Sequence, residues 1–254
     1  MSRRAWMILT AVKLASAMLW LEAGLPFVAI AVYAAVDVFL LYGIFVPSAS
    51  GVCPVITRFH AQPSQVWLTI DDGPDPADTP RILDLLDQHS ARATFFVIGE
   101  RAAAHPDLVA EILRRGHDIA HHTHTHPART FWSAGPQRVR AELDQALAAI
   151  RGAGASPRWF RPPVGIKNIF LGRELERRGL ENVGWTVRSY DSRSDDPARV
   201  ASRVMAQVRS GSILLMHEGE WLDARVRVRA IELVLSALTA RGFACVLPRR
   251  EQLN

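Results

Sequence analysis

Residues 66–74, Val-Trp-Leu-Thr-Ile-Asp-Asp-Gly-Pro, run from an apolar stretch directly into two adjacent carboxylates, Asp71 and Asp72. The apolar part is typical of a buried parallel strand. Side chains alternate between the two faces of a strand, but the chain can bend where the strand ends and bring both carboxylates to one cleft. Two like charges held close together resist joint ionisation unless a cation or a shared proton relieves them.

Histidines follow this stretch at a spacing that suits metal binding. His122 and His126 are four residues apart, which places both imidazoles on one side of a helical turn. One carboxylate and these two imidazoles make a three-ligand site for a divalent metal with room for water, and the second carboxylate is left free to act as a base. His117 and His121 are expected to pack or to support the ligands, and His124 points away if the segment is helical.

Two further polar residues follow apolar stretches. Arg161 begins the loop Arg-Pro-Pro-Val-Gly, 161–165, whose prolines fix the backbone. Such a loop can hold the guanidinium beside Asp71 and keep that carboxylate ionised, and it can aim a backbone N–H at a developing oxyanion. His217 ends an apolar run and is a candidate general acid. The alternatives are a plain turn at 71–74, an exposed arginine and a structural histidine.

From residue 66 onward, short apolar stretches alternate with helical patterns that have clear start signals. Strands are expected at 66–71, 93–98, 117–121, 158–161, 182–187, 212–217 and 243–247. Helix starts are expected at Thr79-Pro80, His105-Pro106, Gly135-Pro136, Asp196-Pro197 and Asp223, with helix ends near Gly116, Gly152, Gly179 and Gly242. Seven strands joined by helices predict an α/β fold with a parallel sheet.

The candidate polar residues lie at or just past the carboxyl ends of different predicted strands. They are Asp71, Asp72, His122, Arg161, Asp191 and His217. Residues from many strands that converge at one rim favour a (β/α) barrel, whereas an open sheet gathers them at one switch point.

The amino terminus differs from the rest. Residues 5–21 are apolar apart from a few positions that include Lys13, and residues 27–46 form a 20-residue apolar stretch with one charge, Asp37. About 20 apolar residues span a bilayer, and Lys13 can pair with Asp37 across a helical hairpin. The alternatives are a single signal-anchor, a signal peptide cleaved within 47–51, and a buried helical pair.

We therefore expect residues 1–51 to anchor the protein in a membrane, in a bacterium the inner membrane, and residues 52–254 to form the catalytic domain. Arg3 and Arg4 favour a cytoplasmic amino terminus. One span then places the domain outside the cytoplasm and two spans return it there, so the side of the domain is left open.

Composition excludes several classes of protein. The chain has 254 residues, of which 49% are hydrophobic and 22% charged, so it can bury a sizeable core and is not disordered. The net charge of +5 is spread along the chain without a dense basic run, which disfavours nucleic-acid binding. Arg225, Arg227 and Arg229 are expected on the exposed side of the last helix. Cys53 and Cys245 form no Cys-x-x-Cys pair, and whether they form a disulfide is left open.

Taken together, these motifs resemble the polysaccharide deacetylase family, whose shared domain is called the NodB homology domain or carbohydrate esterase family 4. The resemblance covers residues 64–248. Residues 69–74 are similar to the family's Thr-Phe-Asp-Asp-Gly-Pro, and residues 122–126 fit its His-Ser/Thr-x-x-His pattern. The loop 161–165 resembles its Arg-x-Pro loop, and 215–217 its closing Leu-x-His.

The resemblance implies a distorted (β/α) barrel and a role for each motif residue. Asp71 is implied as the base, and Arg161 as the group that orients it. Asp72, His122 and His126 are implied as metal ligands, usually for zinc. His217 is implied as the general acid, supported by Asp191. Two positions depart from the family pattern: Val164 stands where an aromatic residue is common, although its backbone N–H can still serve an oxyanion, and Ser192 follows Asp191 where tryptophan is common.

The implied function is metal-dependent hydrolysis of N-acetyl or other N-acyl groups on amino sugars of a glycan or cell-envelope glycoconjugate. Three alternatives stay open: deformylation or deacylation of a lipid-linked sugar, hydrolysis of an O-acetyl ester, and a non-catalytic membrane-tethered module that binds glycan. The changed residues at 164 and 192 imply an unusual or smaller acyl-sugar site.

Overall fold

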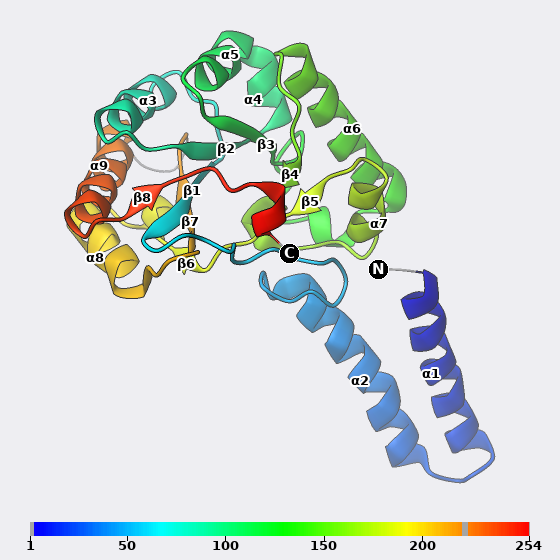
Figure 1. Cartoon of the computed structure of the whole chain (residues 1–254). Helices are drawn as coiled ribbons and strands as arrows, with labels where there is room; N and C mark the ends of the chain where they lie inside the picture. The colour runs from blue at the N-terminus through cyan, green and yellow to red at the C-terminus, as the bar shows by residue number, and fades with distance from the viewer. Residues whose placement is uncertain (1–2, 220–222, 254) are drawn as a thin grey trace.

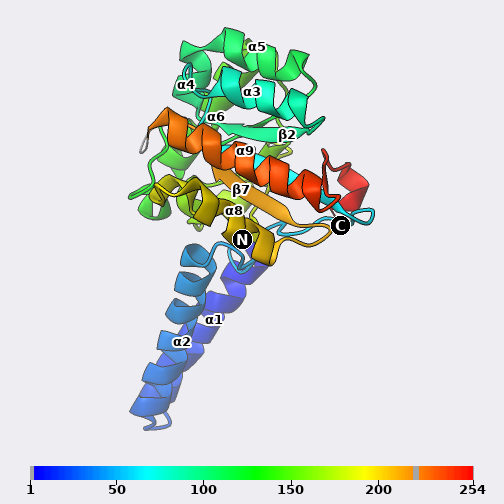
Figure 2. The ribbon, with the colours of Figure 1, turned by 90° about the vertical axis from the view of Figure 1, so that its left-hand side faces the viewer.

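The structure, a computed structural model, describes residues 3–219 and 223–253 as a helical hairpin followed by a sheet that helices surround (Figure 1). The hairpin consists of α1 (Arg3–Leu21) and α2 (Pro26–Phe45). It projects away from the sheet in both views (Figure 1, Figure 2). The part of the chain beyond the hairpin carries all the candidate site residues, at strand ends and in the loops that follow them.

The sheet is built of parallel strands and curls into a half-barrel, with the order β5-β4-β3-β2-β1-β7-β6 and β8 paired to β1. The strands are β1 (Gln65–Asp71), β2 (Ala93–Val97), β3 (Asp118–His121), β4 (Trp159–Phe160), β5 (Glu181–Asn182), β6 (Val187–Arg188), β7 (Ile213–His217) and β8 (Ala244–Cys245). The predicted α/β fold of barrel type is confirmed. The register pairs Asp71 with His217 and with Phe96, so three strands end together.

The two edge strands of the sheet, β5 and β6, are close together because one follows the other in the chain. Four residues separate β5 from β6, and five residue steps span at most about 18 Å. The prediction of one strand over 182–187 was wrong. The guanidinium of Arg161 donates hydrogen bonds to the carbonyl oxygens of Val183 and Gly184, at 3.0 and 2.8 Å. Ile56 also pairs with Val183 in an isolated β-bridge. These contacts interrupt the strand and leave its two ends on opposite edges.

The helices around the sheet begin mostly where proline and capping residues predicted. They are α3 (Thr79–Gln88), α4 (Gly99–Ala104), α5 (Pro106–Arg114), α6 (Pro136–Gly152), α7 (Leu171–Glu176), α8 (Pro197–Gln207) and α9 (Ala224–Ala240). The side chains of Asp196 and Asp223 accept backbone N–H groups at 3.0 and 2.8 Å and cap α8 and α9. Thr79 does not cap α3, because it is already the first helical residue and Asp78 precedes it.

The largest apolar cluster lies between the middle of the sheet and the helices α3, α8 and α9. It combines β-strand residues such as Leu68, Phe95 and Leu214 with helix residues such as Ile82 and Ile231, all fully buried. Each such side chain contributes about 1.5–3 kcal/mol by leaving water. This core holds β1, β2 and β7 in place, and their carboxyl ends carry part of the site.

The two helices of the hairpin are joined by the predicted ion pair. Lys13 Nζ lies 2.6 Å from Asp37 Oδ1, and Lys13 also stands over the ring of Tyr33. The hydroxyl of Ser16 donates to the carbonyl of Ala29. Among the described residues, α2 is long and apolar enough to cross a membrane, whereas the apolar part of α1 is shorter.

The carboxyl end of α2 is packed into the α/β part of the chain. Ile44 belongs to an apolar cluster with Phe131 and Phe160. The backbone N–H of Lys167 donates to the carbonyl of Ile44 at 2.9 Å, and Lys167 Nζ donates to the carbonyl of Val46 at 2.7 Å. The hairpin is therefore fixed to the segment that follows the loop 161–165.

Both cysteines are free thiols. Cys53 and Cys245 are buried in two different apolar clusters. Burial raises the pKa of Cys53 to about 11 and that of Cys245 to about 12. The open question of a disulfide is thus answered by two separate, unreactive thiols.

Candidate active site

A cavity of about 750 Å³ opens at the carboxyl ends of the strands. Five of the predicted residues line it, namely Asp71, Asp72, His122, His126 and His217, together with Val164. Arg161 and Asp191 are buried directly behind this lining. The prediction that the polar residues converge at one rim is therefore confirmed, because the carboxyl ends of parallel strands meet at one edge of the sheet.

Asp71 is held by Arg161. A terminal nitrogen of Arg161 lies 2.5 Å from Asp71 Oδ1, and the same nitrogen donates to Thr69 Oγ1 at 2.9 Å. The rest of the guanidinium donates to the two carbonyls of the interrupted strand, and its carbon stands 4.1 Å from the centre of the Phe96 ring. Arg161 is fully buried. A buried guanidinium whose nitrogens all donate to fixed partners holds the Asp71 carboxylate in one orientation.

Asp72 lies against His122 and His126. Both imidazole Nε2 atoms are 3.3 Å from Asp72 Oδ1, and the two rings are 4.9 Å apart. Burial opposes ionisation of Asp72, but the adjacent imidazole of His122, with the charges of His217 and His126, holds the pKa of this carboxyl below its usual range. Burial lowers the pKa of His126 to about 4, so this ring is neutral near pH 7.

The segment that carries the two histidines is not helical, contrary to the prediction. Residues 122–126 form a loop in which Thr123 and His126 have positive φ angles of 66° and 52°. Glu142 accepts the backbone N–H groups of His124 and Thr125 at 2.9 Å and holds this loop to α6. The two imidazoles therefore converge because the loop folds back on itself, not because they are one helical turn apart.

The other histidines of this region support the loop. Thr123 N–H donates to His121 Nδ1 at 3.0 Å, so the proton of this ring lies on Nε2 and is donated to the carbonyl of Leu143, also at 3.0 Å. His117 is buried in the sheet, where its ring packs on Phe95. The expectation that His117 and His121 pack or support the ligands is confirmed.

The trio of Asp72, His122 and His126 fits a divalent metal. One ligand atom from each residue can be chosen so that all three lie within 4.8 Å of one another. Asp72 Oδ1 is buried and has no hydrogen-bond partner in the described part of the chain, which is costly unless a cation satisfies it. His122 Nδ1 donates to the carbonyl of Arg161 at 2.7 Å, which leaves Nε2 free to ligate. Two imidazoles and a carboxylate are a donor set that suits zinc.

His217 lines the same cavity at the end of β7, in register with Asp71, and is fixed by Asp191. His217 Nδ1 lies 2.7 Å from Asp191 Oδ1, and its backbone N–H donates to Oδ2 at 2.8 Å. The hydroxyl of Ser189 donates to the same carboxylate at 2.7 Å. Burial lowers the pKa of His217, but the charge and hydrogen bond of Asp191 outweigh it, with help from Asp72 and Asp71, and raise this pKa to about 9. The ring is therefore a protonated acid at neutral pH.

The loop 161–165 crosses the cavity wall as predicted. Val164 has a positive φ of 51° and Gly165 one of 76°. A Cβ added at Gly165 would lie 2.5 Å from the ring of Trp185 and 2.8 Å from Pro47, so this glycine allows close packing that no other residue permits. Val164 is 43% exposed at the cavity.

A buried network behind His217 escaped the sequence analysis. Glu218 is fully buried against Gly73, its Oε2 accepts from the hydroxyl of Thr79, and burial raises its pKa to about 8. Asp78 accepts from Arg227 Nε at 2.6 Å. The expectation that Arg227 is exposed with Arg225 and Arg229 was wrong, since its side chain is only 7% exposed. Nothing in the local pattern around residue 227 signals a carboxylate 149 positions away.

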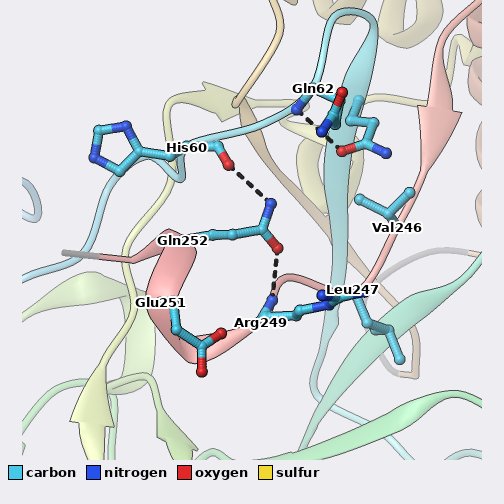
Figure 3. Close-up of a pocket in the computed structure, with 8 residues that line it drawn as sticks. His60, Gln62, Val246, Leu247, Arg249, Glu251 and Gln252 are labelled. Carbon is cyan, nitrogen blue, oxygen red and sulfur yellow. Dashed lines mark hydrogen bonds between the residues drawn. The ribbon is translucent and has the colours of Figure 1, made fainter.

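A second hollow lies at the opposite end of β1 (Figure 3). Gln252 joins its walls, because its Nε2 donates to the carbonyl of His60 and its Oε1 accepts from Arg249 N–H, both at 2.8 Å. Its charged residues, Arg249 and Glu251, come from the carboxyl-terminal turn. The chemistry is assigned to the first cavity, where the carboxylates and imidazoles meet.

Comparison with known proteins places this site among deacetylases. The family model for polysaccharide deacetylase matches residues 60–183. The chain is 40% identical over 190 residues to a chitooligosaccharide deacetylase of a Bradyrhizobium species, covering 70% of this chain and 86% of that protein. It is 32% identical over 183 residues to a peptidoglycan-N-acetylglucosamine deacetylase of Bacillus cereus, covering 71% and 84%.

Solved structures agree with this placement. A family 4 carbohydrate esterase from Streptomyces lividans in complex with acetate superimposes with a TM-score of 0.68 at 30% identity, over 76% of this chain and 96% of that one. A pseudoenzyme of the same family from Bacillus anthracis gives a TM-score of 0.69 at 25% identity, over 79% and 69%.

Proposed function

Because the chain belongs to the polysaccharide deacetylase family, we propose that it is a metal-dependent hydrolase that removes N-acetyl groups from amino sugars of a glycan. The observation that carries the proposal is that two units line one cavity. The metal trio lies beside Asp71, which Arg161 holds. His217, which Asp191 holds, lines the same cavity from the neighbouring strand end. Hydrolysis of an amide needs a base and an acid at one site.

Each residue then has a role. Asp72, His122 and His126 would hold the metal, which we propose to be zinc; when bound it would polarise the acyl carbonyl and acidify water. Asp71 takes the proton of the attacking water, and Arg161 keeps this carboxylate in place as a positioning residue. His217 gives its Nε2 proton to the departing amine, while Asp191 holds the opposite side of the ring. The backbone N–H of Val164 is assigned to the developing oxyanion.

The rival of a non-catalytic glycan-binding module is weaker for this chain. The pseudoenzyme with a similar fold shows that the fold alone does not make a catalyst. Here the metal trio, the arginine-held base and the aspartate-held histidine are all in place. An O-acetyl ester would also fit this cavity, since the same acid and base serve ester hydrolysis.

The test is metal analysis of the full chain together with acetate and amine release from chitooligosaccharides. We expect about one zinc per chain and release that a chelator abolishes. Asp71→Asn should abolish release while zinc content and zinc-dependent thermal stabilisation are retained, and Asp107→Asn, an exposed charge on α5, is the matched control. Full activity of Asp71→Asn would refute the assignment of the base, and a chain that binds no zinc would refute the trio.

We propose further that residues 1–51 anchor the chain in a membrane and that 52–254 form the deacetylase domain. The docked end of α2 supports retention of the hairpin, because cleavage within 47–51 would remove Ile44 from its cluster and two carbonyls from Lys167. The first turn of α1 lies at the same end of the hairpin as the domain (Figure 1), which places the two on one side of the bilayer if both helices are immersed. This can be checked in closed membrane vesicles by labelling one cysteine introduced at residue 2 and another introduced at Arg173 with a reagent that does not cross the membrane. If the reagent labels one of the two cysteines and not the other, the proposed topology is refuted.

A further inference from the structure

The wall of the catalytic cavity carries more positive charge than hydrolysis of a neutral sugar needs. Four arginines line it, Arg129, Arg138, Arg188 and Arg193, against the two carboxylates of the catalytic pair. In the described residues none of these four guanidinium groups has an ion-pair partner, although the arginines at the carboxyl ends of α5 and α7 do, namely Arg114, Arg115, Arg177 and Arg178. An N-acetylated polymer of glucosamine is uncharged and offers such groups nothing to neutralise. A cavity walled by unpaired arginines concentrates anions.

Arg188 is the most firmly placed of the four. It lies on β6, and its guanidinium carbon stands 4.8 Å from the ring centre of Tyr190 and 5.5 Å from that of Trp185. Its Nε is buried without a hydrogen-bond partner among the described residues. Aromatic rings thus hold the group at the cavity while its donors stay free, which is the arrangement that a phosphate, with several acceptor oxygens, satisfies.

The cavity also lies next to the point where the hairpin joins the domain. Gly165, in the cavity wall, packs on Pro47, two residues beyond the end of α2. Trp132 packs on Phe45, the last residue of α2, with ring centres 5.4 Å apart. If α2 lies in the bilayer, a substrate headgroup at the membrane surface is within reach of the cavity.

Exposed apolar side chains of the domain cluster at the same place. Beyond the hairpin, the large apolar residues that are strongly exposed in the described chain are Trp132, Val164 and Tyr190, at 40%, 43% and 42%. Val164 lines the cavity, Trp132 contacts α2, and Tyr190 lies under Arg188. Aromatic side chains are favoured at the interface of a membrane with water.

We propose that the substrate of this site is an N-acylated amino sugar joined through phosphate or diphosphate to a membrane lipid. The inference rests on the proposed function, since it names the substrate of the same hydrolysis. Arg188, with Arg138 and Arg193, binds the phosphate, and the exposed apolar residues face the lipid. The reaction is unchanged: water and the amide give a free carboxylate and an amine, and the phosphate bonds stay intact.

The experiment uses the full zinc-loaded chain in lipid nanodiscs and compares three substrates. These are an N-acetylglucosaminyl diphosphate on a prenyl lipid, water-soluble N-acetylglucosamine 1-phosphate, and neutral chitotetraose. We expect the highest kcat/KM for the lipid-linked sugar and the lowest for chitotetraose.

Single variants then separate phosphate binding from folding. Arg138→Gln and Arg193→Gln change exposed residues, and Arg188→Gln changes the ring-held one. Each should lower kcat/KM on both phosphorylated substrates about tenfold, the size of one charge-assisted contact, and leave chitotetraose within about twofold. Arg151→Gln, at the far end of the same helix as Arg138, is the matched control and should change nothing. Thermal melting confirms that each variant is folded.

The possible results of this experiment separate the lipid-linked substrate from the proposed hydrolysis. Equal kcat/KM on phosphorylated and neutral sugars, with no effect of the three variants, would overturn the inference and leave the proposed function standing. Equal use of the lipid-linked and the soluble phosphate would refute the lipid source. Failure to release acetate from any substrate, with zinc bound, would overturn the proposed function itself, so the two failures are distinguishable.

Discussion

Replacing Asp191 by asparagine should move the alkaline limb of the pH–rate profile. Asp191 holds His217 through its ring Nδ1 at 2.7 Å and its backbone N–H at 2.8 Å. Asparagine has nearly the same shape and keeps one acceptor, but it removes the charge. The charge and hydrogen bond of Asp191 are the largest factors that raise the pKa of His217 to about 9, against the opposing effect of burial.

The magnitude follows from this pKa. Without the Asp191 charge, burial brings the pKa of His217 back to or below its ordinary value of 6.5, a loss of about 3.4 kcal/mol of imidazolium stabilisation at about 1.36 kcal/mol per pKa unit. At pH 7.5 the protonated fraction falls from roughly nineteen-twentieths to roughly one-tenth or less. The alkaline limb of kcat/KM should move from about pH 9 to about pH 6.5 or below, and kcat at pH 7.5 should fall at least about tenfold.

Two measurements check this prediction. The first is the pH profile of kcat/KM, and the second is the titration of the His217 ring by NMR in metal-free protein. Asp195→Asn, an exposed aspartate in the same loop, is the control. An alkaline limb that stays at the wild-type pH in Asp191→Asn would refute the reasoning.

The same pKa also affects stability, with a definite sign. The folded-state pKa of His217 lies above its unfolded value, so the ion pair stabilises the fold fully below about pH 6.5 and this contribution is lost as the pH rises through about 9. Asp191→Asn should therefore lose most stability at low pH and little above pH 9. Urea denaturation at pH 6 and pH 9.5 measures the difference, and an equal loss at both values would contradict it.

Three more predictions concern buried charges. Arg161→Met leaves Asp71 buried without its partner and should cost about 3–5 kcal/mol of unfolding free energy; urea denaturation measures it, and a cost below about 1 kcal/mol would contradict the buried pair. Glu218→Gln removes a carboxyl whose pKa is raised by burial from 4.5 to about 8. In the wild type, the contribution of this carboxyl to the free energy of unfolding is fully present below about pH 4.5 and is lost as the pH rises to about 8. The variant should gain as much as about 5 kcal/mol over wild type at pH 8 (3.5 pKa units) and nothing at pH 4, and a constant difference between these pH values would argue against it. Lys167→Met removes the donor to the two carbonyls after α2 and should speed proteolysis within 47–51 several-fold, an effect that Arg173→Met should not share.

Much of the candidate site was predictable because its residues sit at recognisable breaks in local patterns. Asp71 and Asp72 end an apolar strand, Arg161 begins a proline loop, and His217 ends another strand. Parallel strands bring their carboxyl ends to one edge, so residues far apart in sequence meet there without further information. The pairing of Lys13 with Asp37 was predictable in the same way, because a short turn aligns two antiparallel helices.

Other features depended on contacts between distant segments, which local spacing does not encode. The sequence of residues 182–187 predicts one strand. In the structure, Arg161 donates hydrogen bonds to two backbone carbonyls of this stretch, and its two ends pair with opposite edges of the sheet. Residues 122–126 have helical spacing, yet Glu142 from α6 holds them as a loop. The sequence predicts Arg227 as a surface residue, whereas in the structure it is buried in an ion pair with Asp78.

By itself, then, the sequence determined which side chains form the site, on which rim they meet and that an apolar hairpin precedes them. Only the tertiary structure decided how the loop 122–126 bends and which groups are buried with a partner. It also decided that the end of α2 and four arginines without an ion-pair partner among the described residues lie at the cavity. The physical reason is that strand and helix periodicity arises from neighbours in the chain. A buried charge or a free guanidinium is defined by its whole surroundings, and these exist only once the chain has folded.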